Sequence, residues 1–256
     1  MMPEDTLLGI IENFRRRDAG TAFVCRRQYR RARWSYGQVA DLSGRLAAVL
    51  RRRGVGRGDR IVLWGYDGPE WVATFFACVL RGAVTVPMDR DAALDFVRRV
   101  CRQVGAKLCI GARGNPQIDP LLPTIAFEDF PELAARHDAG ATREEEPGSD
   151  DPVEIVFTSG TTAEPKGVVL THGNILANLV PLEREISRYL KYERFVHPLR
   201  FLNLLPLSHV FGQFLGIFIP QILGGTVVFQ DTLNPSGILR TIRKERVYVL
   251  VAVPRV

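Results

Sequence analysis

Residues 158–167 read TSGTTAEPKG and combine hydroxyl, glycine and lysine residues of the kind that bind phosphate. A Walker loop would need GxxxxGK followed by Ser or Thr, whereas Lys166 follows Pro165 and precedes Gly167. Backbone N–H groups and hydroxyls at a glycine-relaxed turn can still point at one anion, so we expect polyphosphate as the ligand. The alternative is a polar hairpin on the surface.

This loop needs a strand to deliver it, and the chain offers a regular series of strands and helices. Short β-branched runs predict strands that are buried on both faces: 60–66, 107–112, 124–127, 153–159, 201–207, 226–230 and 248–253. Between them, apolar residues at helical spacing predict helices at LSGRLAAVLRRRG, EWVATFFACVLRG, LDFVRRVCRQVG and residues 174–190. This alternation indicates an α/β fold with a mainly parallel sheet flanked by helices. The glycines of GVGRGD, residues 54–59, follow a helix and precede a strand, which predicts a helix stop rather than a dinucleotide site.

Composition limits the classes of protein that we consider. The 256 residues are 46% hydrophobic and carry a net charge of +6, which comes from arginine-rich stretches within the first 53 residues. We interpret these runs as solvated faces, with attraction to nucleic acid or anionic lipid as the lesser alternative. The four cysteines lack metal-site spacing and lie in or beside apolar stretches, which predicts buried, reduced thiols and a cytoplasmic protein.

The uncharged stretch 210–229 is long enough to span a bilayer. Pro220, Gly224 and Gly225 divide it, so we expect a buried helix followed by a buried strand. A membrane-associated surface is the alternative.

At family level, TSGTTAEPKGVVLTHGNI resembles the signature loop of the adenylate-forming (AMP-binding) superfamily, which includes the acyl-CoA synthetases. WSYGQVADLSGRLAAVLRRRGVGRGDRIVL, LRGAVTVPMD and LNLLPLSHVFGQ are similar to further blocks of that family, in family order. One departure is Ala163, which stands where the family usually has glycine.

The resemblance implies a two-step reaction with ATP, Mg²⁺ and coenzyme A. A carboxylate attacks the α-phosphate of ATP, pyrophosphate leaves, and a thiol captures the acyl-adenylate. It implies that Thr158 also contacts Mg²⁺ and that Lys166 lends charge to the phosphates. The expected nucleotide contacts are Thr158, Ser159, Gly160, Thr161, Thr162, Lys166 and Gly167.

The block PLSHVFG, residues 206–212, indicates the acid substrate. Relatives that activate amino acids carry an aspartate here, whereas residues 208–211 supply no carboxylate. His209 resembles the histidine of the acyl pocket, and Phe211 could help to wall that pocket, together with Phe214, Leu215 and Phe218, so we expect a carboxylic acid substrate of the fatty-acid class. We interpret His172 as structural, capping the following helix.

Family members are about twice as long, so the resemblance implies a truncated N-terminal domain of the acyl-CoA synthetase fold. Residues 60–199 would form its first α/β subdomain, and residues 1–59 and 200–256 would form parts of a second subdomain with the start of a second sheet. We expect this chain to be part of a fatty-acyl-CoA ligase that is inactive alone. Fatty acyl-AMP ligase and a non-catalytic remnant that binds phosphate or a partner are the alternatives. No nucleic acid partner is expected, while peripheral membrane contact and an apolar sheet edge that favours a homodimer stay open.

Overall fold

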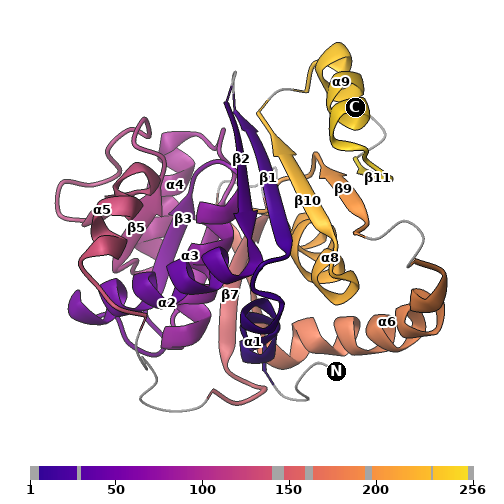
Figure 1. Ribbon diagram of the computed structural model, residues 1–256. Helices are drawn as coiled ribbons and strands as arrows, with labels where there is room; N and C mark the ends of the chain where they lie inside the picture. The colour runs from indigo at the N-terminus through magenta and orange to yellow at the C-terminus, as the bar shows by residue number, and fades with distance from the viewer. Residues whose placement is uncertain are drawn as a thin grey trace.

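The computed structural model describes residues 6–27, 30–139, 147–158, 164–193, 198–231 and 233–252, and it contains two β-sheets (Figure 1). The six-stranded sheet has the order β6-β5-β3-β4-β7-β8. Its strands are β3 (Arg60–Trp64), β4 (Val84–Met88), β5 (Leu108–Gly111), β6 (Thr124–Ala126), β7 (Pro152–Thr158) and β8 (Lys166–Thr171). All neighbours pair in parallel except β7 and β8, which are antiparallel. The predicted α/β class with a mainly parallel sheet is confirmed.

The second sheet has the order β11-β9-β10-β1-β2. Its strands are β1 (Thr21–Arg27), β2 (Arg30–Ser35), β9 (Arg200–Asn203), β10 (Thr226–Gln230) and β11 (Val249–Val251). Only β2 runs antiparallel to its neighbour. A second sheet beginning near residue 200 is therefore present. The prediction had not included β1 and β2, which complete this sheet from the N-terminal side.

The helices cover the sheets and fill the space between them. They are α1 (Leu8–Arg17), α2 (Tyr36–Arg52), α3 (Pro69–Arg81), α4 (Leu94–Val104), α5 (Phe130–Ala135) after the 3₁₀ turn η1 (Phe127–Asp129), α6 (His172–Glu193), α7 (Val210–Gln213), the π-helical turn η2 (Phe214–Phe218), α8 (Ile219–Leu223) and α9 (Pro235–Glu245). Helix α2 begins with a capping box between Ser35 and Gln38 and ends in basic residues that suit the helix dipole. Helix α2 lies within residues 1–59, which we expected to belong with the second sheet, but it packs chiefly along α3. The division into two subdomains stays a prediction.

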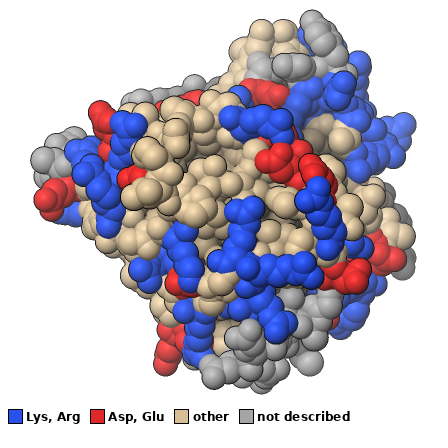
Figure 2. Space-filling view, turned by 90° about the vertical axis from the view of Figure 1, so that its left-hand side faces the viewer, with Lys and Arg blue, Asp and Glu red and all other residues tan. Residues whose placement is uncertain are grey.

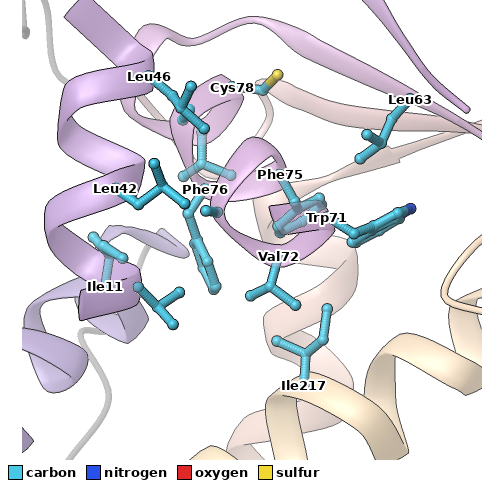
Figure 3. Packing of buried hydrophobic residues seen from close by; sticks show 14 of the residues in the cluster. Ile11, Leu42, Leu46, Leu63, Trp71, Val72, Phe75, Phe76, Cys78 and Ile217 are labelled. Atoms are coloured by element: carbon cyan, nitrogen blue, oxygen red, sulfur yellow. The ribbon is translucent and has the colours of Figure 1, made fainter. Parts of the chain in front are cut away.

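The main core forms around α3, which is apolar on nearly every face and buried along its whole length except at Glu70. Figure 3 shows Trp71, Phe75 and Phe76 of α3 between Leu42 of α2 and Ile217 of η2. Because these residues come from segments far apart in the sequence, this core joins the elements of both sheets.

Two further predictions from composition are confirmed. All four cysteines are buried and free. The uncharged stretch forms the short helical segments α7, η2 and α8 followed by the buried strand β10. Within the described ranges, no helix is long and apolar enough to cross a bilayer.

The arginine-rich stretches lie largely on the surface. Figure 2 shows Lys and Arg side chains in several separate groups over one face, with acidic residues among them. Some arginines have structural partners: Arg27 pairs with Glu70, and Arg26 and Arg31 bond to Glu245. The exposure of most of these arginines agrees with the interpretation of the runs as solvated faces, while the three paired arginines have a structural role in addition.

Candidate functional site

The candidate phosphate loop joins β7 to β8 as a β-hairpin. Thr158 and Lys166 lie opposite each other in the antiparallel register, so the two strands bring them to the two ends of the loop. Ser159, Gly160, Thr161 and Thr162 lie outside the described residues. The hairpin that we considered as an alternative geometry is therefore present. A hairpin is compatible with phosphate binding, because the loop sequence contains the hydroxyl residues Thr158, Ser159, Thr161 and Thr162.

Lys166 is exposed at the start of β8. An exposed ammonium group at the mouth of a loop can reach a phosphate without losing a structural partner. Gly167 has a different local reason to be glycine. A Cβ at this position would lie 2.8 Å from Ile155 Cγ2 and 2.8 Å from Phe157 Cζ, both on β7. Gly167 thus lets the side chains of β7 lie across β8, and this contact supports a packing role for it.

The loop begins at the sheet edge where the carboxyl ends of β3, β4 and β7 meet, because these three strands are parallel neighbours. In open α/β sheets, ligands bind outside the carboxyl ends of the strands. The carboxyl ends of both sheets share a cavity of about 200 Å³, lined by Gly65, Tyr66, Asp67, Met88, Asp89, Arg90, Asp91, Asn203, Leu204, Pro206, Ser208, Phe229, Gln230, Asp231 and Leu233. The parallel topology therefore directs the phosphate loop and this cavity to the same side of the molecule.

Two polar groups distinguish this cavity. Asp67 Oδ1 accepts a hydrogen bond from the Leu207 backbone N–H (3.1 Å), and burial raises the pKa of this carboxyl to about 7. The Ser208 hydroxyl is buried and has no hydrogen-bond partner. Buried hydroxyls are normally paired, so Ser208 keeps unused hydrogen-bonding capacity directly behind the cavity wall. A larger hollow of about 580 Å³ lies beside the amino end of β5, away from this edge.

The predicted acyl-pocket residues lie at the start of α7. His209 is exposed, and Phe211 is 65% exposed. The turn before them is tightly packed, since a Cβ at Gly212 would lie 2.0 Å from the Pro206 carbonyl oxygen. The structure places both side chains on one short segment next to Ser208, and it does not bury them.

A buried contact joins this segment to the phosphate-loop strand. Gln213 Nε2, at the end of α7, donates to Glu154 Oε2 on β7 (2.8 Å) and to the Leu207 carbonyl oxygen (3.0 Å). Both side chains are fully buried. Sequence reasoning missed this pair, although a glutamate inside the apolar run VEIVF was an available signal.

His172 has a structural role, but not the predicted one. Its Nδ1 accepts a hydrogen bond from the Leu7 backbone N–H (3.1 Å), and burial lowers the pKa of the ring to about 4. The helix cap comes instead from Thr171 and Asn174, whose side chains each accept the other's backbone N–H. Because β8 runs from Lys166 to Thr171, His172 lies at the end of the strand remote from the loop.

The described ranges contain no group of three or more His, Cys, Asp or Glu that could hold a metal ion. Mg²⁺ commonly keeps several waters and binds through substrate phosphates with one or two protein ligands. The residues present fit a magnesium ion carried by a bound nucleotide better than a separate all-protein site. The assignment of Thr158 to Mg²⁺ stays a prediction.

The chain matches the family described as "AMP-binding enzyme" over residues 12–256. It is 32% identical over 235 residues to the long-chain-fatty-acid--CoA ligase FadD13 of Mycobacterium tuberculosis, covering 88% of this chain and 45% of that protein. It is 30% identical over 225 residues to a feruloyl-CoA synthase of Amycolatopsis, covering 86% of this chain and 43% of that protein. The chain therefore spans less than half the length of these relatives.

Solved structures agree with the fold. O-succinylbenzoate coenzyme A synthetase of Bacillus subtilis, in complex with AMP, superposes with a TM-score of 0.76 at 23% identity, covering 96% of this chain and 61% of that one. The inhibitor-bound N-terminal domain of FACL13 from Mycobacterium tuberculosis superposes with a TM-score of 0.79 at 24% identity, covering 98% and 63%. At these identities the likeness establishes the fold.

Proposed function

The chain belongs to the AMP-binding enzyme family, and we propose that it forms the phosphate-holding part of an ATP-dependent acyl-CoA ligase. The observation that supports this most is the β7–β8 hairpin. It sets Thr158 opposite Lys166 at the carboxyl edge of the parallel strands, where the shared cavity also opens.

The chemistry requires a carboxylate to attack the α-phosphate while pyrophosphate leaves. Lys166 would neutralise charge on the β- and γ-phosphates, and the loop from Thr158 would hold them in place, with N–H and hydroxyl groups directed at the leaving end. Mg²⁺ bound with the nucleotide would spread the charge of the departing pyrophosphate. Coenzyme A then supplies the thiol that takes the acyl group from AMP.

We further propose a fatty acid as the carboxylic acid substrate. Residues 208–211 at the start of α7 carry no carboxylate that could pair with an amino group, and Phe211 offers an exposed aromatic surface for an acyl chain. By their names, the relatives given above act on fatty acids in one case and on an aromatic acid in the other. The choice of a fatty acid over an aromatic acid is therefore the more specific part of this proposal. A fatty acyl-AMP ligase, or a non-catalytic remnant that keeps only the phosphate site, are the alternatives.

Titration calorimetry with Mg·ATP tests the phosphate site. Lys166→Ala removes a charge-assisted hydrogen bond, so binding should weaken by about 1–3 kcal/mol, or roughly 5- to 150-fold in Kd. Lys244→Ala, at an exposed lysine in the last turn of α9, is the matched control and should bind like the wild type. Equal affinities for the wild type and Lys166→Ala would remove this lysine and its loop from the mechanism.

A further inference from the structure

The side chains of Glu154 and Gln213 have more hydrogen-bonding atoms than they use in the structure. Gln213 Nε2 uses its two hydrogens on Glu154 Oε2 and the Leu207 carbonyl oxygen. A carbonyl oxygen can only accept, so the contact with Leu207 fixes which end of the Gln213 amide is nitrogen. The remaining atoms, Glu154 Oε1 and Gln213 Oε1, are both buried and both lack a partner.

These two unpaired oxygens belong to side chains that one hydrogen bond already joins. If Glu154 is ionised, both are acceptors and neither can satisfy the other. A proton on Glu154 Oε1 would satisfy both, because the acid O–H can donate to Gln213 Oε1. We propose that Glu154 is a protonated carboxylic acid that forms a cyclic, doubly hydrogen-bonded acid–amide pair with Gln213 and so fixes residues 207–213 against β7.

The surroundings of Glu154 favour the neutral form. Burial raises the pKa of its carboxyl to about 7, and the hydrogen bond from Gln213 opposes this only in part. On β4, the register partner is Thr85, which carries no charge. Next to Thr85 lies Cys78 of α3, whose thiol stays neutral because burial raises its pKa to about 12. On β8 the register partner is the apolar Leu170.

The pair has a positioning role that rests on the proposed function. Strand β7 delivers the phosphate loop, and residues 207–213 carry His209 and Phe211. The acid–amide pair is a direct side-chain link between these two parts. Glu154 and Gln213 therefore set the distance between the phosphates and the acid substrate without touching either.

The test compares the pH dependence of urea unfolding in the wild type and in Glu154→Gln. A glutamine here can keep both hydrogen bonds as an amide–amide pair, but it cannot ionise. The unfolded glutamate loses its proton near pH 4.5 and the folded one near pH 7. The wild type should therefore lose stability relative to Glu154→Gln as pH rises between these values, by about tenfold in the unfolding constant per pH unit. Subtracting the pH profile of Glu154→Gln from that of the wild type removes the contributions that other titrating groups make to both.

Glu132→Gln, at an exposed glutamate on α5, is the control and should leave the wild-type pH profile unchanged. Carbon-13 NMR of the wild-type glutamate carboxyls gives a second measurement that needs no stable variant. One carboxyl should titrate near pH 7. An ordinary glutamate pKa for every carboxyl, or a parallel pH profile for wild type and Glu154→Gln, would overturn the proposal.

Hydrogen exchange measures the positioning role without ATP or an acid substrate. Above pH 7, amides in residues 207–213 should exchange faster in the wild type than in Glu154→Gln at the same pH. Equal exchange would refute the positioning role. Because this readout involves no ligand, a failure of ATP binding would count against the proposed function alone.

Discussion

Gly167→Ala tests whether this glycine is required by the packing of β7 against β8. The added Cβ would lie 2.8 Å from Ile155 Cγ2 and 2.8 Å from Phe157 Cζ, distances that real Cβ atoms essentially never show. Phe157 is buried among the residues of a core cluster, so its ring has little room to move. Inserting a methyl group into such a site costs about 1–3 kcal/mol. For a chain of this size, each kcal/mol lowers Tm by about 2–4 °C.

Urea unfolding and thermal melts of the wild type and of Gly167→Ala measure this loss of stability. Gly114→Ala is the matched control, because a Cβ at that position meets nothing within 4 Å and its stability should stay within about 0.5 kcal/mol of wild type. Ile155→Ala removes one of the two crowded atoms, so the double variant should lose less stability than the two single changes added together. If Gly167→Ala unfolds like the control, the packing explanation for this glycine is wrong.

Three other changes address buried charges and the reaction. In urea titrations, the wild type should lose roughly 3 kcal/mol of stability as pH falls from about 6.5 to about 4, because the unfolded histidine binds a proton in this range and the buried ring does not. His172→Gln should abolish this loss. An unchanged pH profile in the variant would argue against the neutral ring. Glu245→Gln should cost about 1–3 kcal/mol at neutral pH, because Glu245 accepts hydrogen bonds from Arg31 and Arg26. The hydrogen bond from Arg31 is the largest cause that lowers the pKa of Glu245, so this contribution should be complete above the usual glutamate pKa and be lost progressively as pH falls from there through the lowered value. Equal unfolding of variant and wild type at neutral pH would refute it. Pyrophosphate release from ATP should appear with palmitate only when the chain is joined to a family-type C-terminal half, and palmitate-dependent release by this chain alone would contradict that expectation.

The regular part of the fold was predictable because its strands are continuous β-branched runs. VEIVF and TVVFQ, for example, form β7 and β10 as expected. Strand β2 was missed because four of its six residues are exposed and three are arginines, so no apolar pattern marks it. Strand β8 was missed because its first residues, Lys166 and Gly167, belong to the loop motif.

The candidate site was predictable only where its residues are adjacent in the sequence. Residues 158–167 identify the phosphate loop by their types and order. The link between Glu154 and Gln213 spans 59 positions and depends on which side chains the fold buries together. The bond from Leu7 to His172 spans 165 positions, and for the same reason no local pattern indicates it.

The open edges of the two sheets differ in how they would meet another strand. In the described part of the chain, β2 is one edge strand of its sheet, opposite β11, and β8 is one edge strand of the other, opposite β6. Strand β2 exposes Arg30 and Arg33 on either side of Arg31, which is paired with Glu245, so two copies approaching along it would repel each other. Strand β8 exposes Val168 and Val169 by about half and carries no such charges along its length after Lys166. Salt that screens arginines would thus remove the barrier at the β2 edge, while the β8 edge has almost none to remove, which makes β8 the more aggregation-prone of these two edges.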